Sequence, residues 1–387
     1  MNRPAVSDRF PARWEASGLA ALTGHSEEAV LPERDFLARL DALLSQVEGL
    51  AALFGVRLRL DRRVFTGRAA LMGLARRGQV SCNGSCRLIG ARDGWIAVNL
   101  ARQEDVGLVA AWLCRDVDEH WEAIKAAAQQ TAADALVERA ELLGLPVAGV
   151  PHPATPLTLT LSQWEREHGP RLSNPRPLGE GGTRARRAWE GEGRCLRVID
   201  LSALWAGPLC GQLLTRIGCH VIKVESASRP DSARFGPTSF FEQLHRGQEF
   251  VALDFASPDG RTKLRDLILS ADVVVEGSRP RALRQLGIDR DAIMAERPSL
   301  IWVSITAHGR DDHRVGFGDD AAAAAGLLAW DRANRPVFVG DAIADPIAGL
   351  TAAAGVFQRL LRGVGGCVDI SLSGAAAWVA AAEPVPC

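Results

Sequence analysis

The segment from Gly340 to Leu350 carries the residues of this sequence that are best suited to chemistry. A short apolar run, 336–339, ends just before it, and the dipeptide Asp345-Pro346 opens an apolar stretch that continues to Leu361. An aspartate at a helix N-cap accepts hydrogen bonds from backbone N–H groups, and proline is tolerated in the first turn. The sequence therefore predicts that Asp345 caps a helix. The positive end of that helix would also favour an ionised carboxylate, so a second interpretation is that Asp345 acts as a nucleophile.

Residues 195–387 show the alternating strand and helix pattern that would position this segment. Apolar strands are predicted at 196–201, 220–225, 250–255, 272–276 and 300–305, with helical segments between them. Strands with little polar interruption that alternate with helices indicate a mostly parallel sheet covered on both faces. We therefore expect a Rossmann-like α/β domain at 195–387. Its first strand is not followed by G-x-G-x-x-G, so a dinucleotide is not indicated.

Residues 1–150 are predicted to form a mainly helical domain with one β-hairpin. Apolar residues at helical spacing fill 35–54, and the two strands of the hairpin are expected at 87–90 and 94–100. Further helices are predicted at 68–77, 104–114, 119–129 and 132–143. Residues 151–194 are rich in proline, glycine and arginine and lose apolar periodicity, which is typical of a linker.

The overall composition favours no charged partner. Lys and Arg number 45 against 46 Asp and Glu, a balance that indicates neither nucleic acid nor an anionic membrane surface. No stretch approaches the roughly 20 apolar residues of a membrane span, and the first residues lack the apolar core of a signal peptide, so we expect a cytoplasmic location. Of eight cysteines only Cys82 and Cys86 lie close together. Because a single C-x3-C pair is weak evidence for zinc, we expect free thiols and no metal site.

A series of motifs from Val198 to Leu372 resembles CoA-transferase family III, the CaiB/BaiF family. That group includes formyl-CoA and carnitine CoA-transferases and 2-methylacyl-CoA racemase. Each motif alone is weak, and their common order makes the resemblance specific. The motifs are Val-Ile-Asp-Leu-Ser at 198–202, Ala-Gly-Pro at 206–208, Val-Ile-Lys-Val-Glu at 221–225, Leu-His-Arg-Gly at 244–247, Ala-Asp-Val-Val-Val-Glu at 271–276, Asp-Pro-Ile-Ala-Gly-Leu at 345–350 and Val-Asp-Ile-Ser-Leu at 368–372.

The resemblance implies a reaction and a nucleophile. It implies a transfer of CoA from an acyl-CoA thioester to a small carboxylic acid through an aspartyl anhydride and an aspartyl-CoA thioester. CoA would be a substrate, and no tightly bound cofactor is expected. The family's nucleophilic aspartate falls on Asp345. Asp341 is the competing candidate, but the spacing to Gly349 and Gly355 favours Asp345.

The resemblance also implies where CoA would bind, namely at the first βα turn and the loops after the next strands. The expected contacts are two turn residues and four cations that would face the nucleotide phosphates: Ala206, Gly207, Lys223, Arg234, Arg246 and Arg279. The chain departs from the family in this region, because His245 and Gly277 stand where asparagine is usual and Gln248 stands where lysine is usual.

Two alternatives to CoA transfer stay open. One is an acyl-CoA racemase or isomerase on the same scaffold, although Phe317 occupies the position of the racemase histidine. His308 lies near in sequence, and a lone histidine at a strand end is more often a core or surface residue. The other alternative is a degenerate CoA-binding protein without turnover.

The N-terminal part resembles the second half of the same family. The similar segments are 16–24, 93–98 and 143–150, so the chain places a second half before a first half. This order fits either a permuted monomer or a fused intramolecular pseudo-dimer, and a homodimer is a further option. Asp35, which precedes an apolar helix, is then either a helix N-cap or a relic of a duplicated nucleophile.

Overall fold

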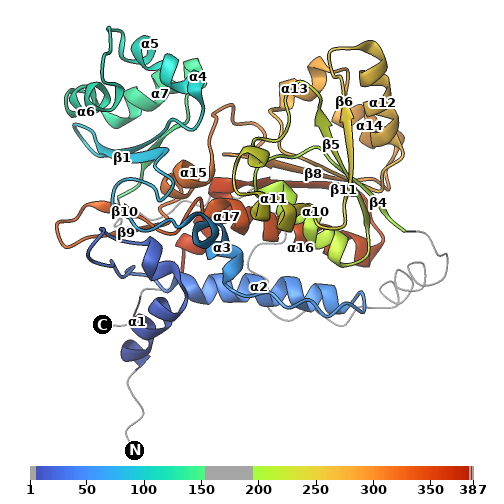
Figure 1. Cartoon of the computed structure of the whole chain (residues 1–387), viewed down its shortest axis with the longest axis horizontal. Helices are drawn as coiled ribbons and strands as arrows, with labels where there is room; N and C mark the ends of the chain where they lie inside the picture. Colours follow the sequence, from blue (N-terminus) through green and yellow to red (C-terminus); the bar gives the residue numbers. More distant parts are fainter. Residues whose placement is uncertain (1–5, 153–194, 383–384, 386–387) are drawn as a thin grey trace, which may run out of the picture.

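The computed structural model describes residues 6–152, 195–382 and 385. The predicted linker therefore lies outside the described residues from position 153 onward. Figure 1 shows a sheet with helices on both faces on one side of the molecule and a smaller helical unit on the other, with a long helix, α2, running beneath them.

A six-stranded parallel sheet forms the centre of the C-terminal part, in the order β11-β8-β7-β4-β5-β6. The expectation of a mostly parallel α/β sheet is thus confirmed. The strands are β4 (Arg197–Asp200), β5 (His220–Ser226), β6 (Glu249–Leu253), β7 (Val273–Glu276), β8 (Ile301–Thr306) and β11 (Gly366–Ser371).

Successive residues of the central strands point to opposite faces of this sheet, as strand geometry requires. Val198 packs with helices α10 and α16, whereas its neighbour Ile199 packs with helices α12, α13 and α14 on the other face. Both faces are therefore apolar and covered. These helices are α10 (Ala206–Arg216), α12 (Pro258–Leu269), α13 (Pro280–Gln285), α14 (Arg290–Glu296) and α16 (Ala344–Arg362).

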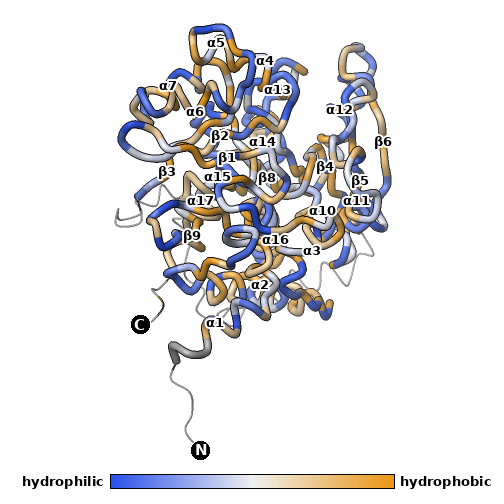
Figure 2. Tube along the Cα trace, turned by 60° about the vertical axis from the view of Figure 1, so that its left-hand side comes forward, coloured by the Kyte–Doolittle hydropathy of each residue, from blue (hydrophilic) through white to orange (hydrophobic). Residues whose placement is uncertain are grey.

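The first helices of the chain complete the core around α16. Helix α2 (Phe36–Ala52) packs its apolar stripe against α16, and Figure 2 shows α16 surrounded by α2, α3, α10 and α17 (Leu372–Ala380). Residues 10–65 thus share one hydrophobic cluster with the sheet. Helix α1 (Val6–Ala16), the 3-10 turn η1 (Leu19–Leu22) and α3 (Arg63–Met72) accompany them. The predicted bounds of the helix at 68–77 are wrong, because Gly73 adopts φ 63° and ends α3 at Met72.

The smaller unit is an antiparallel sheet of β1 (Cys86–Gly90), β2 (Trp95–Asn99) and β3 (Val147–Val150). The hairpin is confirmed, and the third strand was not predicted. The helix expected at 104–114 is split at Leu108. One face of the sheet carries α4 (Gln103–Gly107), α5 (Val109–Leu113), α6 (His120–Gln130) and α7 (Ala133–Leu143).

The other face of the small sheet packs on α15 (Gly318–Ala324) and on the ribbon of β9 (Leu328–Trp330) and β10 (Pro336–Phe338). Two short elements, η2 (Ser232–Phe235) and α11 (Thr238–His245), lie between β5 and β6. Among the described residues, no helix combines the length and the apolar character needed to cross a membrane.

Candidate active site

Asp345 is the second residue of α16, not its N-cap. The cap is Ile343, and the Asp345 backbone N–H closes the preceding turn on the Ala342 carbonyl at 2.9 Å. The predicted capping role is therefore wrong, because the helix begins two residues earlier, after a turn through Gly340 (φ 72°) and Ala342 (φ 44°). A positive φ at a non-glycine residue costs energy and has to be held by its surroundings. Here the Ala342 N–H donates to Asp319 Oδ1 at 2.8 Å.

Four aspartates gather at this helix start: Asp319, Asp320, Asp341 and Asp345. The first three accept hydrogen bonds from other parts of the chain. Asp341 is completely buried and forms a bidentate ion pair with Arg68, at 2.8 Å from Nε and 2.6 Å from Nη2. Its carboxylate is thus already occupied, which disfavours it as a nucleophile.

The N-terminal part of the chain supplies the polar partners of this cluster. Besides Arg68 on α3, Asn83 Nδ2 donates to Asp319 Oδ2 at 2.9 Å, and Asn99 Nδ2 donates to Asp320 Oδ1 at 2.7 Å. No role was predicted for these three residues from the sequence. Asn83 was noticeable only as half of a turn-forming Asn-Gly pair, and Asn99 as a polar end to an apolar strand.

Asp345 differs from its three acidic neighbours because its carboxyl group accepts no hydrogen bond from any described residue. No donor in the described part of the chain hydrogen bonds to it, and the residue keeps some exposed surface. Burial raises its pKa to about 7; Arg68 opposes this rise, whereas the charge of Asp319 adds to it. Gly318 gives it room, since a Cβ there would lie 2.3 Å from Asp345 Oδ2. Asp345 is therefore ionised in a substantial fraction at neutral pH and remains available for chemistry.

The pH dependence of stability offers a test of this buried cluster. Burial raises the pKa of Asp320 to about 7, well above the value of 3.8 expected in an unfolded chain. The folded protein then holds a proton that the unfolded chain releases, so the stability present at acidic pH is lost as the pH rises toward 7. Asp320→Asn keeps the oxygen that accepts from Asn99 and Phe317. We therefore expect the difference in free energy of unfolding between Asp320→Asn and the wild type to shift in favour of the variant between about pH 5 and pH 8. The shift should be on the order of 1 kcal/mol or more.

Chemical denaturation at several pH values measures this difference. Asp259→Asn, at an exposed position on α12, is the matched control and should show the slope of the wild type. Equal pH slopes for Asp320→Asn and the wild type would contradict the expectation.

The first βα turn lies directly against α16. Ala206 and Gly207 are buried at the start of α10, and a Cβ at Gly349 would lie 2.5 Å from the Ala206 carbonyl oxygen. Gly349 is one helical turn after Asp345. The structure thus brings the predicted CoA-binding turn next to the predicted nucleophile.

Lys223 and Arg234 are committed to contacts inside the protein. Lys223 is completely buried, with Nζ donating to the Ser202 carbonyl and lying 3.3 Å from Asp231 Oδ2. Arg234 forms an ion pair with Glu225 and stacks over the rings of Phe241 and Phe250. Lys223 thus holds the loops that follow β4 and β5, Arg234 holds the loop that follows β5, and both charges are paired within the protein.

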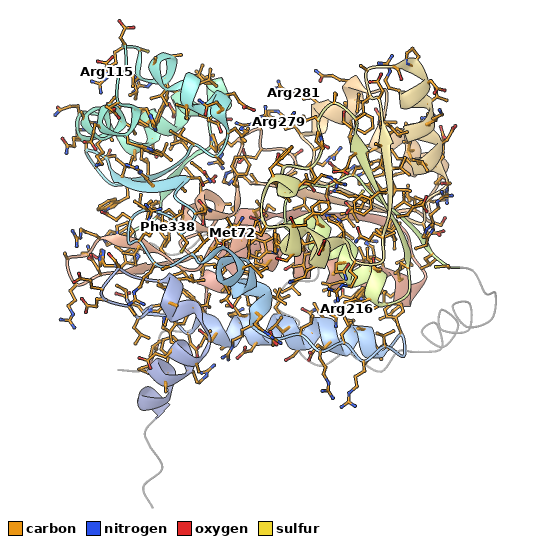
Figure 3. All side chains as sticks on the ribbon, viewed as in Figure 1. Met72, Arg115, Arg216, Arg279, Arg281 and Phe338 are labelled. Carbon is orange, nitrogen blue, oxygen red and sulfur yellow. The ribbon has the colours of Figure 1, made fainter. Side chains whose placement is uncertain are left out.

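Arg246 and Arg279 are the exposed members of the predicted set. Arg246 follows the last residue of α11, and Arg279 precedes α13. The Arg279 guanidinium faces the small unit, since a Cβ at Gly144 would lie 3.8 Å from it (Figure 3). Partial desolvation and neighbouring cations lower the pKa of Arg279, and these cations are Arg102, Arg281 and Arg229. This Arg279 group concentrates positive charge, which suits a phosphorylated ligand.

Two of the three departures from the family, His245 and Gln248, contact each other. His245 Nδ1 and Gln248 Oε1 lie 2.8 Å apart, and burial lowers the pKa of His245, so the imidazole is neutral and donates to the amide oxygen. The third departure, Gly277, is exposed at the end of β7.

His308 and Asp35 are the two remaining candidates from the sequence. Burial lowers the pKa of His308 to about 4, and a Cβ at Gly316 would lie 3.0 Å from its Nε2. Asp35 accepts from the Ala38 N–H at the start of α2 and pairs with Arg13 at 2.9 Å. Of the two interpretations of Asp35, the N-cap is confirmed.

Comparisons with known proteins concern the C-terminal part of the chain. Residues 195–385 match the profile of CoA-transferase family III. A succinyl-CoA–D-citramalate CoA-transferase of Chloroflexus aurantiacus is 32% identical over 193 residues, which cover 46% of this chain and 48% of the relative. A succinate–glutarate CoA-transferase of Agrobacterium fabrum is 28% identical over 199 residues, covering 46% and 50%.

Among solved structures, a CaiB/BaiF family protein from Brucella suis is similar at 30% identity and a TM-score of 0.44, over 48% of this chain and 54% of that one. The chain spans about half the length of the curated relatives it matches. Residues 195–385 are therefore similar to CoA-transferase family III, as the motifs in this part of the sequence had indicated.

Proposed function

We propose that this protein transfers CoA from an acyl-CoA thioester to a carboxylic acid, with Asp345 as the nucleophile. The observation that supports this most is the state of the Asp345 carboxyl group. Its three acidic neighbours are held by Arg68, Asn83 and Asn99, whereas no described residue occupies it. Its place in the first turn of a 19-residue helix also favours the ionised form.

The reaction would proceed by four attacks that need no net proton transfer. The Asp345 carboxylate attacks the thioester carbonyl and expels the CoA thiolate, which forms a mixed anhydride. The thiolate then attacks the aspartyl carbonyl, releasing the donor acid and leaving an aspartyl-CoA thioester. The acceptor carboxylate displaces the thiolate again, and the thiolate finally attacks the new acyl group. This last step regenerates the Asp345 carboxylate and yields the second acyl-CoA.

The Arg279 group would hold the CoA phosphates in this proposal. Arg229, Arg279 and Arg281 come from the sheet domain, whereas Arg102 of the small unit is already paired with Asp105, so the sheet domain would supply the main phosphate contacts. Lys223 and Arg234 would act indirectly, by fixing the loops that carry the turn of Ala206 and Gly207. Arg246 would remain a peripheral contact.

The acceptor would be a small carboxylic acid, and dicarboxylic acids are the first to test. The two transferases described above are named for succinate or succinyl-CoA with D-citramalate or glutarate. Because Arg68, Asn83 and Asn99 reach the site from the same chain, the contacts support an intramolecular arrangement over one that requires a second copy. A cytoplasmic location is part of the same proposal.

Trapping of the covalent intermediate tests this function. The protein is incubated with acyl-CoA thioesters and hydroxylamine, and the modified residue is mapped by mass spectrometry. We expect a hydroxamate on Asp345, formed at a rate that rises as the pH increases through about 7, because the carboxyl must lose its proton to attack. No modification with any thioester, despite calorimetric binding of CoA, would support the non-catalytic alternative. Exchange of the α-proton without an acceptor acid would support the isomerase.

A further inference from the structure

Among the neighbouring charged groups, Arg68 has the largest effect on the pKa of Asp345. It comes from outside residues 195–385. It lies on α3, one turn before Met72, which Figure 3 labels near the middle of the molecule. Nε and Nη2 both contact the Asp341 carboxylate, and the guanidinium carbon lies 5.0 Å from the centre of the Trp205 ring. Trp205 immediately precedes the turn of Ala206 and Gly207. A bidentate pair that also lies over an aromatic ring has one well-defined position.

We propose that Arg68 is a positioning residue of this site, which fixes Asp341 and the first βα turn and supplies the positive charge that keeps Asp345 reactive. This inference rests on the proposed function of Asp345. It gives the N-terminal part a defined task, because the family-matching part of the chain does not itself supply this cation.

The charges around Asp345 support this role. Helix α15 contributes Asp319 and Asp320, the segment before α16 contributes Asp341, and α3 contributes Arg68. Cys82, beside Asp341, is neutral because burial raises its pKa to about 12. The effect of Arg68 on the pKa of Asp345 is downward and larger than the upward effect of any one of the three aspartates. Without Arg68, a carboxyl group surrounded by acidic residues would hold its proton more tightly.

A simpler alternative is that Arg68 only neutralises Asp341. An unpaired carboxylate in a buried site is strongly destabilising, so Arg68→Gln alone could perturb the fold. The double variant Arg68→Gln/Asp341→Asn separates the two roles, because it removes the ion pair without leaving an unpaired charge. Arg68 lowers the pKa of Asp345 by more than Asp341 raises it, so our proposal expects the double variant to keep part of the defect of the single one.

The experiment compares the wild type, Arg68→Gln, Arg68→Lys and the double variant. The rate of Asp345 adduct formation is measured against pH, and circular dichroism with thermal unfolding verifies that each variant folds. We expect the pH midpoint of Arg68→Gln to move to more alkaline pH, with an adduct rate at pH 7 lowered by about tenfold or more, and the midpoint of the double variant to move in the same direction by a smaller amount. Arg68→Lys should restore part of the rate, because it keeps the charge and loses the bidentate contact.

Arg63→Gln is the matched control, because Arg63 lies on the same helix with its side chain 86% exposed and pairs with Asp61. Its midpoint should equal that of the wild type. A wild-type pH profile in Arg68→Gln or in the double variant would overturn the proposal.

A second measurement keeps this inference separate from the proposed function. Isotope-edited infrared titration follows the Asp345 carboxyl directly, with Asp345→Asn identifying its band. If the wild type forms no adduct, the proposed function fails, yet an alkaline shift of this titration in Arg68→Gln would still support the role of Arg68. An unshifted titration would refute it.

Discussion

Replacing Asp345 with asparagine should lower the rate of CoA transfer by about 10⁴-fold or more, the scale seen when a nucleophile is removed from an enzyme. The amide has the same shape as the carboxyl group but cannot attack a thioester. Folding should be preserved, because no described residue depends on the Asp345 carboxyl for a hydrogen bond, and burial raises its pKa to about 7. We expect the midpoint of thermal unfolding at neutral pH to equal or exceed that of the wild type. Steady-state assays with acyl-CoA donors and dicarboxylate acceptors measure the activity.

Asp35→Asn is the matched control for this prediction. Asp35 also stands at the start of a long buried helix, but it accepts from the Ala38 N–H, and asparagine is an equally good N-cap. This variant should keep full activity. If Asp345→Asn retained activity within tenfold of the wild type, the assignment of the nucleophile would be wrong, and Asp341 would be the next residue to test.

Gly318→Ala should reduce the rate by about 10²-fold or more without unfolding the protein. The added Cβ would lie 2.3 Å from Asp345 Oδ2 and 2.5 Å from the Ala342 carbonyl oxygen, far inside van der Waals contact. The carboxyl group or the α16 entry has to move, and a displacement of about 1 Å at a reacting group can cost 10²-fold in rate. Overpacking of this kind typically costs about 1–3 kcal/mol of stability. Single-turnover adduct formation and chemical denaturation measure the two effects.

Gly49→Ala provides the matched control for this glycine. It lies in α2, and a Cβ added there would meet nothing within 4 Å. Alanine in a helix interior is favoured over glycine, so Gly49→Ala should raise stability by roughly 0.5–1 kcal/mol and leave the rate unchanged. A Gly318→Ala variant as active as Gly49→Ala would show that the Asp345 carboxyl does not need its observed position.

Local sequence patterns were sufficient to predict the strands and helices of the sheet domain. The alternation of apolar strands with helices predicted the parallel sheet, since each strand such as 273–276 is buried on both faces. The pairs Arg87 with Val98 and Ile89 with Ile96 show the hairpin that was predicted from the two strands at 87–90 and 94–100. Where the patterns failed, neighbouring backbone geometry decided the outcome. Gly73 ended α3 earlier than its apolar spacing suggested, and the turn at Ala342 started α16 before Asp345.

The sequence by itself determined the family resemblance of residues 195–385, the parallel sheet and Asp345 as the candidate nucleophile, because these depend on short motifs and on their order along the chain. Only the tertiary structure decided which charged side chains form ion pairs within the protein and which stay available for a ligand. Lys223 pairs internally, and Arg68 lies 273 positions from the Asp341 that it binds. An ion pair leaves no periodic signal in a sequence, since its partners come from elements that meet only when the core is packed. The environment of Asp345 is therefore a property of the folded chain.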